Sequence, residues 1–169
     1  QEGAWAEVVS GFEYEKALKN GVPGNKIIFN GPSKTDDDLK KAIENFSLIH
    51  IDHFDELYKI ISLSENSEKK PRVAIRVNMD TGIYPQWDRF GFNYENGEAW
   101  DALNRIMMCK KLDLTGIHAH IGTYIMSTEP YKIAAAKLAA LVVSVERKYQ
   151  HVVKYIDIGG GFASRNTLK

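Results

Sequence analysis

The sequence has little cysteine, no long hydrophobic run and no excess of either charge, and each absence excludes a class of protein. Its single cysteine, Cys109, cannot form an internal disulfide or a cysteine-rich metal site, which fits a reducing compartment. No stretch approaches the roughly 20 apolar residues of a membrane-spanning helix. The N-terminus also lacks the basic-then-apolar order of a signal peptide. We therefore expect a cytoplasmic protein with no membrane partner.

The charges balance, with 22 Lys plus Arg against 22 Asp plus Glu, so no overall positive field would hold nucleic acid. At 169 residues, with 44% hydrophobic and 26% charged content, the chain can bury one globular core. The composition therefore predicts a single domain over residues 1–169 and no nucleic-acid partner.

Apolar, β-rich runs alternate with helical periodicity along the chain, a pattern typical of parallel strands joined by crossover helices. Six strands are expected, at residues 6–9, 26–29, 48–51, 72–78, 114–121 and 155–158. The clearest helices are expected at residues 54–63, 95–110 and 129–149. Ser10 and Glu13 form a capping-box pattern, and Thr35 is placed to cap another helix. About six βα units of an α/β protein are thus predicted.

One connection, residues 79–94, stands apart because it contains Gly82, Pro85 and Gly91 and is longer than most βα loops. We expect no regular element within it and interpret it as a functional or mobile loop.

Six units without a visible domain break favour a partial (β/α)8 TIM barrel over an open doubly wound sheet. A complete barrel needs eight strands, so an incomplete one would expose an apolar edge. In both architectures ligands lie at the carboxyl ends of the strands. The residues that follow each strand are therefore the candidates for chemistry.

Gly159, Gly160 and Gly161 follow the last predicted strand. Three residues without Cβ allow backbone N–H groups to approach an anion closely, as a phosphate requires. The same run can also form a tight turn that binds no ligand.

His118 and His120 are two residues apart at the end of a predicted strand, so both are expected on one face, toward the barrel axis. They could offer two imidazoles to a divalent metal, although a catalytic zinc normally needs a third protein ligand, and none is evident. Alternatively, an imidazole could lie flat on a planar aromatic ligand while Thr123 and Gly122 contact its anionic group. Both could also be hydrogen-bonded core histidines, and the spacing leaves these alternatives open.

Glu7 alternates with Val8 on the first strand, which predicts an inward-facing carboxylate in need of a partner. A solvated position at the edge of the sheet is the alternative. Asp157 can equally brace a loop, and Arg76 and Arg89 can be surface or salt-bridge residues.

Taken together, six motifs resemble one family. They read EVVS at 7–10, IIFNGPSK at 27–34, IRVN at 75–78, RFGF at 89–92, GIHAHIGT at 116–123 and DIGGGF at 157–162. In this order they are similar to the diaminopimelate/ornithine/arginine decarboxylases, which are fold-type III enzymes that depend on pyridoxal phosphate and have an alanine-racemase-like barrel. The resemblance runs from Gly3 to Phe162, and the chain is identified as an internal fragment of such an enzyme.

The resemblance implies a barrel that holds pyridoxal 5'-phosphate. His120 would stack on the pyridine ring, and the phosphate would lie among Thr123, Gly159, Gly160 and Gly161. By the same resemblance the catalytic residues are Glu7 near the cofactor's lysine linkage, His120, and Arg89 near the phenolic oxygen as in alanine racemases. No metal ligand is implied.

The reaction implied is decarboxylation of a basic or diamino acid such as diaminopimelate, ornithine or lysine. By resemblance, the first barrel strand with the cofactor's lysine precedes Gln1 and the C-terminal β-domain follows Lys169. The fragment alone is then expected to be inactive, and the full-length enzyme to be a homodimer. Tyr124 and Ala163 replace the glutamine and proline common in the family, which leaves the substrate open.

Three alternatives remain at this point. A racemase or a non-catalytic barrel that binds pyridoxal phosphate would share the fold. A metal-dependent hydrolase would use His118 and His120. A silent interaction domain would use none of these residues.

Overall fold

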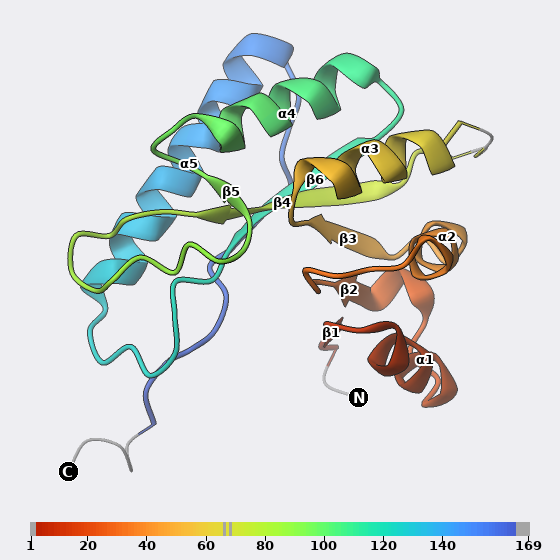
Figure 1. The fold of residues 1–169 in the computed structure, drawn as a ribbon, viewed down its shortest axis with the longest axis horizontal. Helices are drawn as coiled ribbons and strands as arrows, with labels where there is room; N and C mark the ends of the chain where they lie inside the picture. The colour runs from red at the N-terminus through yellow and green to blue at the C-terminus, as the bar shows by residue number, and fades with distance from the viewer. Residues whose placement is uncertain (1–2, 66, 68, 165–169) are drawn as a thin grey trace.

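The computed structural model describes residues 3–65, 67 and 69–164, so the ends of the predicted domain, 1–2 and 165–169, lie outside it. Strands and helices alternate along the chain (Figure 1). The elements are β1 (Ala6–Val8), α1 (Gly11–Lys19), the 3₁₀ helix η1 (Gly24–Lys26), β2 (Ile27–Phe29), α2 (Asp36–Glu44), β3 (Leu48–Ile51), α3 (Phe54–Leu63), β4 (Arg72–Asn78), β5 (Phe92–Asn93), α4 (Glu98–Cys109), β6 (Asp113–Ala119), α5 (Glu129–Tyr149) and β7 (Tyr155–Asp157). None of the described helices is long and apolar enough to cross a membrane.

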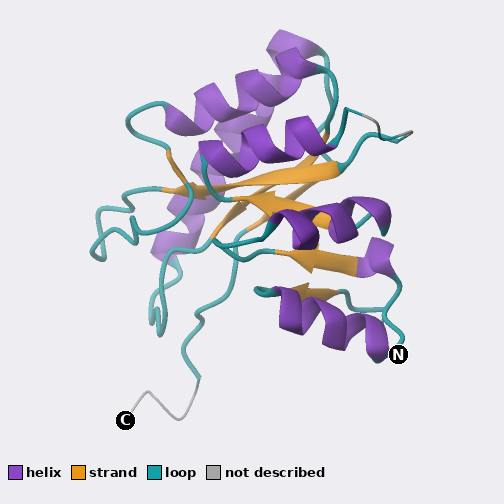
Figure 2. Ribbon diagram, turned by 45° about the vertical axis from the view of Figure 1, so that its right-hand side comes forward, coloured by secondary structure: helices purple, strands orange, loops and turns teal. Residues whose placement is uncertain are grey.

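The strands form one parallel sheet in the order β1-β2-β3-β4-β6-β7, and β5 pairs with β4 outside this path. Figures 1 and 2 show the five α-helices along one side of the curved sheet, with the loops after β4 and β6 at one end of the strands. A crossover that contains a helix joins each strand from β1 to β6 on the path to the next, so that all of them run parallel, as in a TIM barrel. The predicted partial (β/α)8 barrel is confirmed, and the described sheet is open between β1 and β7.

The prediction that residues 79–94 contain no regular element is wrong at β5. Gly91 has φ +86°, and a Cβ there would lie 2.7 Å from the carbonyl oxygen of Arg76, so only glycine lets the chain approach β4 this closely. The Asn78 amide then donates to the carbonyl oxygens of Phe90 and Gly91, at 3.1 and 2.8 Å. The long loop therefore returns to the sheet and adds two paired residues to it.

The helix caps follow the predicted residues with one change. The Ser10 hydroxyl accepts from the Glu13 amide at 3.3 Å, but the Glu13 carboxylate accepts from the amide of Val9 instead of that of Ser10. At α2, Thr35 and Asp38 form both halves of a capping box.

The two faces of the sheet differ in chemistry. The core between the sheet and the helices is apolar and includes Ile49, Ile75 and Ile117, all fully buried. The opposite face of β4 and β6 carries Arg76 and His118, which are buried but polar. Because successive side chains alternate between faces, the strands that build the core also gather polar groups on the side away from the helices.

Candidate active site

The parallel register aligns polar residues across three strands. Arg76 on β4 is paired with His118 on β6, which is paired with Asp157 on β7. Residues paired in register project to the same face of a sheet. This row lies near the carboxyl ends of the strands, where ligands bind in barrels.

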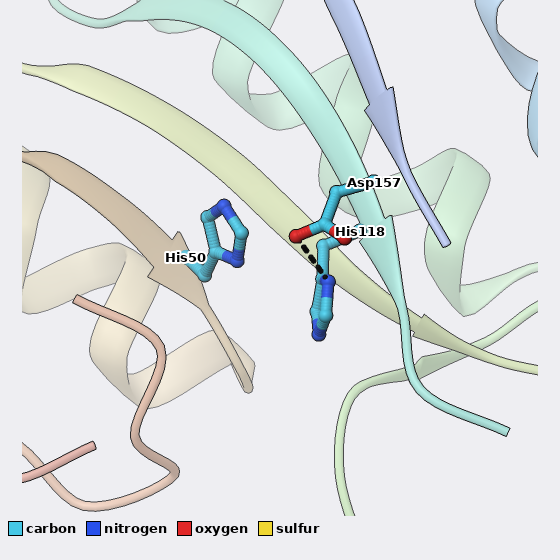
Figure 3. A group of neighbouring side chains, drawn as sticks. All are labelled: His50, His118 and Asp157. Atoms are coloured by element: carbon cyan, nitrogen blue, oxygen red, sulfur yellow. Dashed lines mark hydrogen bonds and ion pairs between the residues drawn. The ribbon is translucent and has the colours of Figure 1, made fainter. Parts of the chain in front are cut away.

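His118 and Asp157 form the centre of the site (Figure 3). The Nδ1 atom of His118 lies 2.8 Å from Oδ2 of Asp157, and Oδ1 of Asp157 accepts from the Gly159 amide at 2.8 Å. Burial raises the pKa of Asp157, but the hydrogen bonds from His118 and Gly159 outweigh it and hold the pKa below its usual range. Asp157 therefore braces the glycine loop from inside the sheet.

Asn30, at the end of β2, connects this pair to Glu7. Its Nδ2 atom donates to Oε1 of Glu7 at 2.7 Å and lies 3.0 Å from Nε2 of His118. The Glu7 side chain is exposed on β1, an edge strand of the described sheet, which agrees with the alternative of a solvated position at the edge. Its predicted need for a partner is met by the Asn30 amide.

His50 on β3 lies beside this pair, with its ring centroid 4.8 Å from that of His118. The side chain is buried, and neither ring nitrogen has a partner within the described residues. Burial, reinforced by the neighbouring His118 imidazole, lowers the pKa of His50 well below its ordinary value. His50 is therefore held neutral.

Ligand-type atoms of His50, His118 and Asp157 all lie within 4.8 Å of one another, and this is the only such trio within the described residues. Two imidazoles and a carboxylate suit zinc and similar divalent ions. The sequence suggested His120 as the second ligand beside His118, but His120 does not belong to this group. The potential ligands near His118 are His50 and Asp157. Both ring nitrogens of His118 already have hydrogen-bond partners, which a metal would have to displace.

His120 lies just beyond β6, whereas the sequence placed it within the strand. Its half-buried ring meets the edge of Trp87, with centroids 6.3 Å apart, and forms no hydrogen bond within the described residues. Burial and then the charge of Arg76 lower the pKa of His120. A neutral imidazole at the end of the strand is suited to stack on a planar ligand.

The glycine loop after β7 packs against the loop after β6. Gly159 and Gly161 have φ +71° and +87°, and a Cβ at Gly161 would lie 1.9 Å from the carbonyl oxygen of Gly122. Ile125 donates its amide to the carbonyl oxygen of Gly161 at 2.9 Å, which joins the two loops. Only glycine permits this approach.

Gly160 differs, because nothing lies within 4 Å of a Cβ built there. The amides of Gly160 and Gly161 have no acceptor in the described part of the chain, and Thr123 is exposed nearby on the facing loop. Free backbone donors beside open space are what a phosphate group requires. The residues present therefore fit the phosphate of pyridoxal phosphate.

Two arginines occupy different environments. Arg89 is exposed in the loop before β5, and its side chain forms no hydrogen bond or ion pair within the described residues. The Arg76 side chain is buried, lies 3.7 Å from a carboxylate oxygen of Asp52, and packs over the Phe90 ring. Burial lowers the pKa of Arg76, against the raising effects of Asp52 and Glu7. Arg76 is therefore the arginine that belongs to the polar row of the site. Its position within an otherwise apolar predicted strand is the feature of the sequence that indicates this.

Lys34, at the end of the predicted turn after β2, is committed to structure. Its buried ammonium donates to Glu56 at 2.6 Å and to the carbonyl oxygens of Gly31 and His50. All three of its protons are therefore used, and the pair fastens this turn to β3 and α3.

Comparisons with known proteins agree with this geometry. Residues 1–169 match the family described as pyridoxal-dependent decarboxylase, pyridoxal binding domain. The diaminopimelate decarboxylases of Aquifex aeolicus and Bacillus methanolicus are 34% and 32% identical and match 94% and 99% of this chain. The chain spans only 39% and 41% of their lengths.

Solved structures give the same result. Diaminopimelate decarboxylase from M. jannaschii in complex with L-lysine superimposes with a TM-score of 0.84 at 27% identity, covering 94% of this chain and 38% of that one. Lysine decarboxylase from Selenomonas ruminantium has a TM-score of 0.81 at 27% identity, covering 96% of this chain and 41% of that one. The chain therefore belongs to the fold-type III pyridoxal-dependent decarboxylases and forms part of their pyridoxal-binding barrel.

Proposed function

We propose that the protein containing this chain decarboxylates a basic or diamino acid with pyridoxal phosphate. The observation that carries the proposal is the meeting of two loops at the carboxyl end of the sheet. There the amides of Gly160 and Gly161 have no acceptor among the described residues, and the space beside Gly160 is open. His120, with its neutral ring, lies against Gly159 in the same place.

Each residue has a proposed part. Gly159, Gly160, Gly161 and Thr123 hold the phosphate, and His120 stacks on the pyridine ring. When bound, pyridoxal phosphate supplies an electron sink for the α-carbon of the amino acid as CO2 leaves.

Two further groups complete the proposal. Asn30 holds Glu7, which by resemblance would lie near the cofactor's lysine linkage and could accept or return a proton there. The resemblance predicts that Arg89 contacts the phenolic oxygen of pyridoxal phosphate. Arg76 is the alternative, because its side chain is buried in the site. No metal is assigned to the reaction.

The proposed class of substrate, basic or diamino acids, is taken from the substrates in the names of the relatives. Those reported above are diaminopimelate and lysine decarboxylases, and one solved structure is a complex with L-lysine. Diamino acids share an α-amino acid head and a distal amine, so we propose this class without selecting a member. A homodimer is proposed with it by resemblance, and a cytoplasmic location because a single cysteine fits a reducing compartment.

We also propose that residues 1–169 alone do not turn over substrate. Lys34 donates all its protons to Glu56 and two carbonyl oxygens, so it is not free to carry the cofactor. The lysine that carries it is expected in the longer protein.

The test uses the full-length protein. We expect a visible absorption band that borohydride abolishes, a pyridoxyl-modified lysine outside residues 1–169 by mass analysis, and CO2 release from at least one diamino acid. A colourless, unmodified protein would refute the proposal. Inversion of an amino acid without CO2 would indicate a racemase, and stoichiometric zinc lost in His118→Ala would indicate the hydrolase.

A further inference from the structure

A continuous chain of hydrogen bonds runs through the candidate site from one edge of the described sheet to the other. It runs from Glu7 on β1 through Asn30 and His118 to Asp157 on β7, and ends at the amide of Gly159. The donor–acceptor distances along it are 2.7, 3.0, 2.8 and 2.8 Å. It therefore joins the proposed proton-handling carboxylate to the proposed phosphate loop.

The direction of these bonds follows from the chemistry of each group. The Asn30 side chain contacts both Glu7 and His118 through the same atom, Nδ2, which has two hydrogens to donate. A carboxylate can only accept, so the contact with Glu7 sets the orientation of the Asn30 amide. The Nε2 atom of His118 must then be an acceptor.

The other side of the ring is determined in turn. A neutral imidazole with an unprotonated Nε2 has its proton on Nδ1, and Nδ1 faces Oδ2 of Asp157. The second oxygen, Oδ1, accepts from the Gly159 amide. Each atom in the chain of hydrogen bonds is thus either a donor or an acceptor. The side chains at its two ends are the carboxylates of Glu7 and Asp157, which only accept.

The surroundings favour this arrangement. His118 and Asn30 are 1% and 7% exposed, so a mismatched pair of donors would have no water to relieve it. The charged or titratable groups around the chain are Arg76, His120, His50 and Lys34. A second proton on His118 would oppose the Asn30 amide and add a positive charge near Arg76.

We propose that His118 and Asp157 are positioning residues, which hold Glu7 as an acceptor and the Gly159 amide in place through a single His118 tautomer protonated at Nδ1. The role of Glu7 and Gly159 toward the cofactor rests on the proposed function, whereas the tautomer does not. A divalent metal bound through the Nδ1 atom of His118, together with His50 and Asp157, would need that nitrogen unprotonated, which is the opposite state.

Nuclear magnetic resonance measures the tautomer of His118 directly. The full-length protein is labelled with 15N-histidine, without added cofactor, and the His118 resonances are identified by their loss in His118→Gln. We expect the proton on Nδ1, facing Asp157, and an unprotonated Nε2, facing Asn30. A proton on Nε2, or on both nitrogens, would overturn the proposal.

A matched pair of variants tests the control by Asn30. Asn30→Asp places a carboxylate on each side of His118, so we expect protonation of both nitrogens and loss of the neutral signal. Asn25→Asp makes the same change at an exposed residue on η1 and should leave the signal unchanged. An Asn30→Asp protein that keeps the wild-type tautomer would overturn the proposal.

The cofactor provides a separate readout. By absorbance titration we expect Asn30→Asp to bind pyridoxal phosphate roughly tenfold more weakly than Asn25→Asp, the scale of one lost hydrogen bond to a charged group. Equal affinities would refute the positioning role even if the tautomer is as expected. If the wild-type protein binds no pyridoxal phosphate, the proposed function fails while the tautomer measurement stands.

Discussion

His50 is an unusual single residue, because a fully buried imidazole has no hydrogen-bond partner for either nitrogen within the described residues. Burying polar atoms without partners costs free energy of folding. Burial, with the neighbouring His118, also lowers the pKa of His50 well below its ordinary value of 6.5. The folded protein thus binds the His50 proton less readily than the unfolded chain does.

This difference predicts acid sensitivity. The contribution of His50 to the free energy of unfolding is intact above about pH 6.5 and falls as the pH drops, by up to about 1.4 kcal/mol per pH unit. In His50→Leu this dependence should be absent. Urea unfolding between about pH 5 and pH 8 measures it, and the values at about pH 8 isolate any change in packing. Equal slopes in both proteins would contradict the prediction.

At the scale of elements, the loop after β7 shows that three adjacent glycines serve different purposes. Gly161 is required by the backbone, because it combines φ +87° with a contact that leaves no room for Cβ. Gly160 has neither constraint, and its open surroundings are where a bound anion would lie. The run therefore combines a structural requirement with a proposed ligand-binding one.

Substitution by alanine should separate these roles. We expect Gly161→Ala to lower the free energy of unfolding by about 1–3 kcal/mol, because strain and the contact with Gly122 force the two loops apart. Gly160→Ala should change it by less than about 0.5 kcal/mol. Denaturant unfolding of both variants tests this difference, and equal stabilities would show that the loops do not meet as described.

At the scale of the whole molecule, the sheet is strongest at its centre. The strands β4 and β6 have seven residues each, and both pair with neighbours on two sides. The strands β1 and β7 have three residues each and lie at the edges of the described sheet. Edge strands leave one row of backbone groups unpaired.

For a protein made of residues 1–169 alone, we therefore expect amide hydrogen exchange to be graded across the sheet. Amides of β4 and β6 should exchange slowest, near the limit of global unfolding, and those of β1 and β7 fastest among the strands. Mass spectrometry of peptides from residues 1–169 measures this gradient. Uniform protection across all strands would mean that the edges are covered, for example by association of chains.

The sequence by itself determined the alternation of strands and helices, the cap at Thr35, the glycine loop and the family, because these depend on local patterns and ordered motifs. It did not predict β5, since two residues carry no periodicity and their pairing depends on the approach of Gly91 to β4. It left the exposure of Glu7 open, because alternation gives the face of a strand and not its position in the sheet.

Only the tertiary structure decided which polar residues meet. The spacing in sequence pairs His118 with His120, yet the partners of His118 are Asn30 and Asp157, which are 88 and 39 residues away. Arg76 likewise enters the site through its register with His118 on the adjacent strand. Strand order and register place these groups together, and both arise from packing across the whole sheet, so no local pattern contains them.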